Sequence, residues 1–305
     1  MANDKNIRGH AAIFAANALW GLNISISRTV LSDLSALTLT TFRMVGAAIV
    51  FWLLSLFLPK EHVKHQDMLK LFFAALLGVV LNQGLFTFGL SYTTAADASI
   101  VATATPILTM IIAAIYLKEP VTNMKVMGIF IGAMGALILI MSCQPSVRHP
   151  GNMLGDVLCL IAQISFAFYL TIFKDLIAKY SPITISKWLF IYASICFIPF
   201  SYADIATIDF TTFSLSLWLR IGYIVIGSTF LAYICLMSSQ RILRPTIVSM
   251  YNYIQPIMVA ILTILMGIDG FGWQKIIAIV LVFLGIFCVT LSKSRNDFEQ
   301  TGREL

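Results

Sequence analysis

The sequence predicts an all-α membrane protein that crosses the bilayer many times. Of its 305 residues, 59% are hydrophobic and only 11% are charged, whereas a soluble protein of this length carries about 25% charged residues. The mean hydropathy is +0.90. The apolar residues also fall into separate runs of about 20, the length that an α-helix needs to cross the hydrocarbon core of a bilayer. Together these observations indicate a polytopic helical bundle in lipid.

Ten apolar runs follow one another along the chain, and we interpret each as a transmembrane helix. The first is too long for a signal peptide and is interrupted by Asn17, Trp20 and Asn23, so it is kept as a span. The runs are His10–Val30, Leu37–Leu58, Met68–Ser91, Ala95–Leu117, Met124–Met141, Asn152–Phe173, Pro182–Tyr202, Leu215–Met237, Ile247–Ile268 and Trp273–Ser292.

The fourth and fifth runs resemble the ninth and tenth. Each pair has a polar start, a mid-helix proline, an acidic turn at Glu119 or Asp269, and a second helix that carries glycine. Aligning the two pairs gives eight identities: Ser99 with Ser249, Pro106 with Pro256, Ile107 with Ile257, Ile111 with Ile261, Lys125 with Lys275, Ile129 with Ile279, Gly135 with Gly285 and Ser142 with Ser292. This pattern indicates a duplicated unit.

The duplication divides the chain into two halves of five helices. The first repeat is expected over residues 1–145 and the second over residues 146–292, joined by the short segment Cys143–Gly151, and residues 293–305 form a polar tail. Because five is an odd number, the second half enters the membrane upside down relative to the first. The sequence therefore predicts a 5+5 inverted repeat.

The positive charges predict the orientation. Cytoplasmic segments of membrane proteins are enriched in Lys and Arg, and the loop Ala203–Ser214, which contains only acidic charges, is expected outside. With the N-terminus inside, five cations lie on the outer side or at outer helix ends: Arg28, Arg43, Arg148, Arg220 and Lys275. The other fifteen Lys and Arg lie inside, so both termini are expected in the cytoplasm and the protein in the cell (inner) membrane.

Several functions are disfavoured by what the spans lack. The net charge of +6 comes from cations between apolar runs, so a nucleic-acid partner is not expected. The five cysteines are scattered without the spacing of a zinc site or a disulfide framework. No carboxylate falls in the central third of a predicted span, and the four histidines lie in loops or at helix ends. We therefore expect no metal, no cofactor and no enzymatic activity, and not the usual cation/proton antiporter, which needs a carboxylate within the membrane.

Several stretches follow one another in a distinctive order: Ala18-Leu19-Trp20-Gly21-Leu22-Asn23, Phe42-Arg43, Gln83 to Thr93, and the run from Ala98 through Pro106 to Glu119 followed by Gly128 and Gly135. In this order they resemble EamA-type transporters of the drug/metabolite transporter superfamily. The resemblance implies a 5+5 inverted repeat around a cavity lined mostly by helices one, three, four, six, eight and nine. It also implies transport of small organic metabolites, often amino acids and often outward. In the second half, Phe166 stands where the first has Trp20, which departs from a symmetric site.

Polar and aromatic residues inside the spans are the candidates for binding a solute. A polar side chain in a span needs a partner or water, so it is often found along a transport pathway. The alternative is hydrogen bonding between helices, worth about 0.6 kcal/mol on average, or for tyrosine a packed ring whose hydroxyl is satisfied. The predicted substrate-binding residues are Trp20, Asn23, Gln83, Thr103, Gln163, Tyr169, Tyr233 and Tyr253.

Prolines and glycines suggest where helices bend or approach closely. Pro106 and Pro256 each remove a backbone hydrogen bond, which leaves free carbonyls near Ala102 and Asn252. Both prolines are predicted hinges, with a static kink as the alternative. The stripe of Gly128, Gly132 and Gly135 predicts close helix packing, with a homodimer face as the alternative. Four tryptophans near span ends are expected interfacial anchors: Trp52, Trp188, Trp218 and Trp273.

The predicted lining is uncharged, rich in amides and aromatic, which suits zwitterionic or aromatic solutes. The favoured function is a secondary transporter that exports small organic metabolites, such as amino acids, by alternating access. The alternatives are an uptake permease of the same fold and a non-transporting membrane assembly or receptor protein. The driving force is left open between facilitated diffusion and coupling through Asp97, Asp156 or Asp175. A small-molecule substrate and the lipid bilayer are the expected partners, and a monomer is expected because one chain contains both halves.

Overall fold

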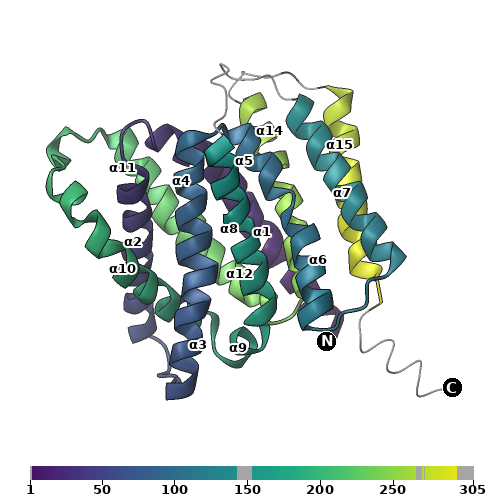
Figure 1. Cartoon of the computed structure of the whole chain (residues 1–305), viewed down its shortest axis with the longest axis horizontal. Helices are drawn as coiled ribbons and strands as arrows, with labels where there is room; N and C mark the ends of the chain where they lie inside the picture. Colours follow the sequence, from purple (N-terminus) through teal and green to yellow (C-terminus); the bar gives the residue numbers. More distant parts are fainter. Residues whose placement is uncertain (1, 143–152, 266–269, 271, 294–305) are drawn as a thin grey trace.

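The computed structural model describes residues 2–142, 153–265, 270 and 272–293, and these residues form helices joined by short loops. Within them, nine helices are long and apolar enough to cross a membrane, from Ala36–Leu56 to Trp273–Leu291. The prediction of an all-α polytopic membrane protein is confirmed (Figure 1). The predicted boundary between residues 145 and 146, the acidic turn residue Asp269 and residues 294–305 of the tail lie outside the described residues.

The observed helices begin and end within a few residues of the predicted runs, except that α1 begins at Ala2 and not at His10. The elements are α1 (Ala2–Val30), α2 (Ala36–Leu56), α3 (His65–Ala75), η1 (Leu76–Gly84), α4 (Leu85–Tyr92), α5 (Ala95–Ala102), α6 (Thr105–Tyr116), α7 (Asn123–Ser142), α8 (Met153–Ile172), α9 (Lys174–Lys179), α10 (Pro182–Ala206), η2 (Phe210–Thr212), α11 (Leu215–Gly222), η3 (Tyr223–Leu231), α12 (Ala232–Gln240), α13 (Pro245–Met250), η4 (Tyr251–Tyr253), α14 (Ile254–Leu265) and α15 (Trp273–Leu291).

Helix α1 stands apart from the nine apolar helices because of its polar residues. Asn17, Asn23 and Ser27 are buried in it, and they lower its hydropathy. The helix packs against α12, α14 and η3, so these side chains face other helices rather than lipid. The tenth span therefore stays a prediction, with α1 as the helix that would supply it.

Helices three and eight of the predicted set each contain a π-helical segment. The first runs α3–η1–α4 and the second α11–η3–α12, and η1 and η3 are both nine residues long. A π-helical turn accommodates an extra residue and exposes backbone carbonyls that an α-helix would use, and such turns are frequent at functional sites. Both halves thus carry the same irregularity in their third helix.

Helices four and nine are interrupted just before their prolines. Helix four breaks between α5 and α6, and helix nine passes through the 3₁₀ turn η4. Pro106 lies in the first turn of α6, where a missing N–H is tolerated. The carbonyl of Ala102, which was expected to be free, lies 2.8 Å from the hydroxyl oxygen of Thr105, whose single hydrogen it shares with Gln163. The break is therefore stabilised by the residue that precedes the proline.

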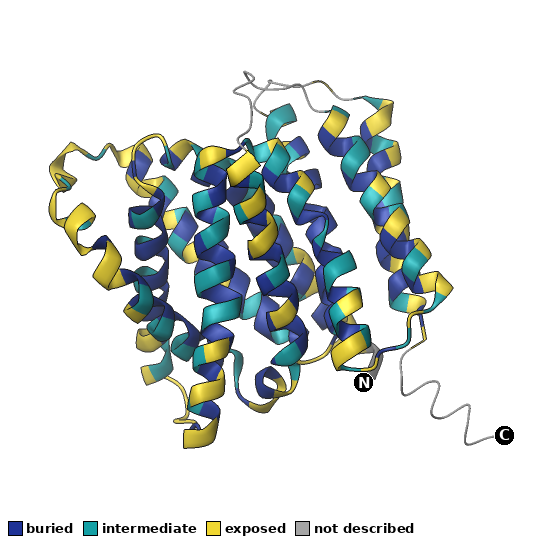
Figure 2. Ribbon diagram, in the orientation of Figure 1, coloured by how far each residue is buried: buried dark blue, intermediate teal, exposed yellow. Residues whose placement is uncertain are grey.

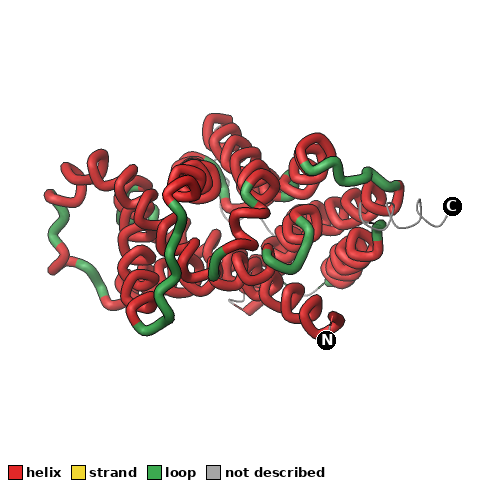
Figure 3. The backbone as a smooth tube through the Cα atoms, turned by 90° about the horizontal axis from the view of Figure 1, so that it is seen from below, coloured by secondary structure: helices red, strands yellow, loops and turns green. Residues whose placement is uncertain are grey.

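The main helix contacts join the two halves of the chain. Helix α1 packs against α12 and α14, while α8 packs against η1, α4 and α6; α2 packs against α10, and α7 against α15. Figure 3 shows the resulting arrangement along the helix axes. Each contact pairs a segment before residue 143 with one after residue 152, so the core is built by both halves together.

The predicted glycine stripe lies in a helix contact within the chain. A Cβ atom at Gly128 would lie 2.8 Å from the carbonyl oxygen of Gly285, and one at Gly135 would lie 2.7 Å from that of Ala278. A Cβ at Gly132 would lie 2.7 Å from the ring of Tyr253. Small residues let two backbones approach at such distances, and here they bring α7 against α15.

The outer surface is apolar, as a lipid-facing surface should be. Phe57 is 84% exposed, Met141 81% and Trp273 82%, and Figure 2 shows exposed residues on the outward faces of the helices. The predicted anchors Trp52 and Trp218 are also exposed, whereas Trp188 is half-buried. In Figure 1 the start of α1 and the end of α15 lie at the same face, at the lower end of the bundle. This end is called the N-terminal face below.

Candidate functional site

A small polar chamber lies between the two halves. Its free volume is about 50 Å³, enough for a few water molecules but far below the 300–1,000 Å³ of typical ligand pockets. Six side chains of the lining are amides, three are aromatic, and none is charged. The lining residues are Trp20, Asn23, Ile24, Asn82, Gln83, Phe86, Gln163, Phe166, Asn252 and Gln255.

Two matching hydrogen bonds cross between the halves beside the chamber. The amide nitrogen of Gln255 donates to Asn17 Oδ1 at 2.9 Å, and the hydroxyl of Thr105 donates to Gln163 Oε1 at 2.8 Å. All four side chains are buried. Gln255 directly precedes Pro256, as Thr105 precedes Pro106. Each interrupted helix is thus tied to the first helix of the other half.

The π-helical segment η3 positions the α1 side of the lining. The indole nitrogen of Trp20 donates to the carbonyl of Ser228 at 2.9 Å, and the Ser228 hydroxyl donates to Asn23 Oδ1 at 2.8 Å. Ser27 donates to the same Asn23 oxygen at 3.0 Å. Because buried polar groups are costly to leave unpaired, these bonds fix the orientation of both lining side chains.

The other π-helical segment, η1, supplies two further amides. The side chain of Gln83 donates to Asn82 Oδ1 and to the hydroxyl of Tyr233, both at 3.3 Å. Asn82 in turn donates to the carbonyl of Ala162 in α8 at 3.0 Å. The chamber is therefore walled by a connected set of hydrogen bonds from both halves.

A layer of aromatic rings closes the chamber on the side of the N-terminal face. Tyr233 donates its hydroxyl hydrogen to the carbonyl of Gly78 at 2.9 Å. The ring of Tyr169 lies against the same glycine, since a Cβ at Gly78 would be only 2.5 Å from it. Tyr169 also stacks on Phe166 with ring centroids 6.0 Å apart. Both tyrosines are fully buried, so they separate the chamber from this face.

Farther toward the N-terminal face, a polar cluster joins α3 to the segment around α9. Asp67 accepts hydrogen bonds from Lys179 and, at 2.6 Å, from the hydroxyl of Tyr180. The hydrogen bond to Asp67 raises the pKa of the Lys179 ammonium. Nearby, Glu61 accepts from the backbone amide of Ser181 at 3.0 Å. Burial alone would raise the pKa of Glu61, but the hydrogen bonds from Ser181 and Thr184 hold it below its ordinary value.

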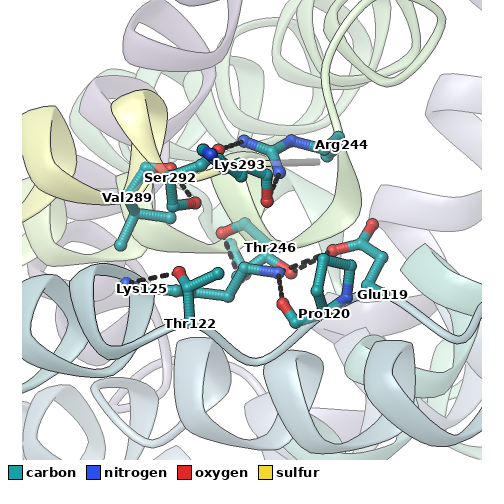
Figure 4. Close-up of polar contacts among 10 residues, drawn as sticks. Glu119, Pro120, Thr122, Lys125, Arg244, Thr246, Val289, Ser292 and Lys293 are labelled. Carbon is teal, nitrogen blue, oxygen red and sulfur yellow. Dashed lines mark hydrogen bonds and ion pairs between the residues drawn. The ribbon is translucent and has the colours of Figure 1, made fainter. Parts of the chain in front are cut away.

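A second polar cluster at this face links the turn after α6 to the start of α13 (Figure 4). Buried Lys125 pairs with Glu119 Oε2 at 3.1 Å and donates to the carbonyl of Pro120 at 2.9 Å. The hydroxyl of Thr246 donates to the same Glu119 oxygen at 3.1 Å. The matching lysine of the second half, Lys275, donates to the carbonyl of Gly270 at 2.6 Å. In both halves the lysine therefore bonds the carbonyl of the residue five positions earlier in the chain.

The predicted site residues fall into three groups. Trp20, Asn23, Gln83 and Gln163 line the chamber. Tyr169 and Tyr233 form the aromatic layer below it. The other two are bonded elsewhere: Thr103 donates to the carbonyl of Ile100 at 2.6 Å, and Tyr253 donates to that of Ile129 at 3.2 Å. The lining residues missing from the predicted set are Ile24, Asn82, Phe86, Phe166, Asn252 and Gln255. The sequence signal that could have identified Asn252 and Gln255 is their position just before Pro256.

Comparison with known proteins gives matches over most of the chain. Residues 7–141 and 153–291 each match the family described as "EamA-like transporter family". An "Uncharacterized transporter" of Archaeoglobus fulgidus is 28% identical over 215 residues, covering 70% of this chain and 74% of that protein. The "Uncharacterized transporter YetK" of Bacillus subtilis is 21% identical over 296 residues, covering 96% and 90%. A solved structure described as "Crystal structure of protein" has a TM-score of 0.73 at 15% identity and covers 94% of this chain and 98% of that one, which shows a shared fold.

Proposed function

The chain belongs to the EamA-like transporter family, and from this premise we propose that it is a secondary carrier exporting a small organic metabolite, such as an amino acid. Transport proceeds by alternating access: one face closes before the other opens, around a site between the halves. The bilayer and the solute are its partners. A monomer suffices, because residues of both halves already line one chamber in a single chain.

The chamber of amide and aromatic side chains is the observation that carries this proposal. Amides offer both donors and acceptors, and aromatic faces contact apolar or planar parts of a solute. Its volume of about 50 Å³ is too small for an amino acid, so we propose that the chamber widens when a solute binds. Such a motion is what a carrier needs and what a static receptor site does not.

The exchanged contacts between the halves support a 5+5 inverted repeat. Gly128 approaches the carbonyl of Gly285 while Gly135 approaches that of Ala278, which is the reciprocal pattern expected for antiparallel α7 and α15 related by a two-fold axis in the membrane plane. The matched bonds of Thr105 and Gln255 follow the same reciprocity. From the excess of Lys and Arg in the segments at the side of the termini, we propose that both termini face the cytoplasm from the cell (inner) membrane.

The proposal is tested by flux through proteoliposomes that contain the purified chain. Vesicles are loaded with a labelled metabolite mixture, and the solutes that leave them are identified. Gln83→Ala and Gln163→Ala are expected to reduce efflux strongly, because each removes an amide from the lining. Ser238→Ala is the matched control, since its hydroxyl bonds only the carbonyl of Ile234 in its own helix among the described residues.

Two results would count against the carrier. One is a lack of protein-dependent efflux for every solute in the mixture. The other is equal efflux by Gln83→Ala, Gln163→Ala and the control Ser238→Ala, which would show that the solute does not bind at the two glutamines. Metabolite profiling of overexpressing cells and their medium then decides between export and uptake.

A further inference from the structure

Arg43 is a fully buried arginine within the membrane-spanning part of α2. Its side chain is 1% exposed, the largest side chain among those almost completely buried. It lies seven residues after the start of the helix at Ala36, so about 10 Å along the helix axis at 1.5 Å per residue. The sequence had placed Arg43 at an outer helix end, but the structure buries it against the second half of the chain.

Within the described residues, Arg43 has no carboxylate partner. Its one hydrogen bond there runs from Nε to the hydroxyl oxygen of Thr229 at 3.2 Å, and its buried Nη2 atom has no partner. The buried cation Lys125, by contrast, is paired with Glu119 at 3.1 Å. Guanidinium groups stay protonated in proteins, and burying an uncompensated charge is strongly unfavourable. The fold therefore keeps a positive charge here that it does not neutralise.

The same π-helical segment connects Arg43 to the chamber. Thr229 receives the Arg43 hydrogen bond, while the adjacent Ser228 holds Trp20 and Asn23 in the lining. Tyr233 follows Thr229 by four residues, and its hydroxyl accepts from the lining residue Gln83. Thr229 and Ser228 of η3 thus connect the Arg43 guanidinium to Trp20 and Asn23 of the lining.

We propose that Arg43 is the subsite for the anionic group of the transported solute and that this group is a carboxylate. The inference rests on the proposed transport function and names its substrate class. When the halves separate and η3 moves, the carboxylate pairs with the Nη atoms of Arg43, whose planar fork matches the two carboxylate oxygens. The ten lining residues contain no acid that would repel it, and their amides bind the remaining polar groups of the solute.

The first experiment uses formate and formamide as probes of the full-length protein purified in detergent. Formate carries the proposed group, and formamide has a similar size without its charge. The melting temperature is measured over a concentration series of each, at constant ionic strength with chloride. Since a ligand of the folded state stabilises it in a saturable way, formate is expected to raise the melting temperature and formamide is not. Equal effects of both probes, or no effect of formate, overturn the proposal.

The second experiment repeats the formate series with variants. Arg43→Gln is expected to abolish the saturable shift, and Arg43→Lys to retain it with roughly tenfold weaker affinity, because an ammonium lacks the bidentate fork. Arg220→Gln removes another arginine of the bundle and should behave as the wild type. If Arg43→Gln does not fold, the formate affinity of Arg43→Lys tests the assignment alone. An unchanged formate affinity in Arg43→Lys, or a retained shift in Arg43→Gln, contradicts the assignment.

Transport separates this inference from the function on which it rests. In proteoliposomes, an exported solute is compared with its carboxamide derivative, in the wild type and in Arg43→Lys. If no solute moves, the carrier function fails. If solutes move but the carboxamide is transported as well as the acid by both proteins, the carrier stands and the carboxylate subsite is wrong.

Discussion

Gln255 donates a hydrogen bond to Asn17 at 2.9 Å from the position directly before Pro256. Its counterpart Thr105, directly before Pro106, donates to Gln163 at 2.8 Å. The helix breaks at the two prolines are therefore each bonded to the first helix of the opposite half. In the proposed carrier, a movement at either break would therefore alter a hydrogen bond to the opposite half.

Breaking either bond is expected to weaken both the fold and transport. Gln255→Leu leaves the oxygen of Asn17 without its partner, and Thr105→Val does the same for Gln163. Removing one partner of a buried hydrogen bond costs about 1–3 kcal/mol, so each variant should lower the melting temperature and reduce efflux to a similar extent. Thermal denaturation and proteoliposome flux measure the two effects.

The control is Thr263→Val in the same helix as Gln255. The Thr263 hydroxyl bonds the carbonyl of Ala260 in its own helix at 2.9 Å, so its loss should be nearly neutral. A Thr105→Val variant as stable and as active as Thr263→Val would show that the bond between the halves has no special role.

The spans could be predicted closely from the sequence because length and hydropathy decide them. The predicted run Ala95–Leu117 corresponds to Ala95–Tyr116, and Trp273–Ser292 to Trp273–Leu291. The interruption near Pro106 was also expected, since proline cannot continue the backbone pattern. These features depend on local chemistry, which a single sequence contains.

The lining could be predicted only in part, because packing between distant segments decides which face of a helix meets the chamber. Tyr253 was an expected lining residue, yet its hydroxyl bonds the carbonyl of Ile129 and its ring packs on Gly132. The π-helical segment η1 (Leu76–Gly84) also changes the register of the third helix, so counting along a regular α-helix does not give the face that meets the chamber. Nothing in the local pattern announces a π-helical turn.

The contact of Tyr169 with Gly78 gives a second prediction. A Cβ at Gly78 would lie 2.5 Å from the tyrosine ring, so Gly78→Ala must displace the ring or the helix. Such overpacking typically costs about 1–3 kcal/mol. We expect a lower melting temperature and altered efflux, because Gly78 also supplies the carbonyl that binds Tyr233.

Gly222→Ala is the matched comparison, in the helix that carries the other π-helical segment. Nothing lies within 4 Å of a Cβ at Gly222, and alanine is favoured over glycine in a helix by about 1 kcal/mol. This variant should be as stable as the wild type or slightly more so. Similar losses for both glycines would contradict the packing explanation.

The buried pair of Lys125 and Glu119 gives a third prediction. Lys125→Met leaves Glu119 as a buried charge bonded only by Thr246 among the described residues, and breaking a buried ion pair costs about 3–5 kcal/mol. The double variant Lys125→Met with Glu119→Gln removes that charge and should recover much of the stability. Chemical denaturation of the single and double variants measures the difference.

Lys70→Met is the control, because Lys70 is 64% exposed and lies 3.7 Å from Asp67. Exposed ion pairs contribute about 0–1 kcal/mol, so this change should be nearly neutral. If the double variant is no more stable than Lys125→Met alone, the loss comes from side-chain packing and not from the uncompensated carboxylate.

The cluster of Asp67, Lys179 and Tyr180 gives the last prediction, since it joins α3 of one half to the segment after α8 of the other. Lys179→Asp places two carboxylates opposite each other, and like charges at contact repel. The N-terminal face should then open more often, which hydrogen exchange in α9 detects as faster exchange of its amides. Combining Lys179→Asp with Asp67→Lys restores opposite charges and should restore protection.

Lys174→Asp, at the first residue of the same helix, should leave exchange unchanged, because an acidic residue is favourable at a helix N-terminus. If the swapped pair exchanges as fast as Lys179→Asp alone, attraction between these two side chains does not hold the face closed, and the closure rests on the aromatic layer at Gly78.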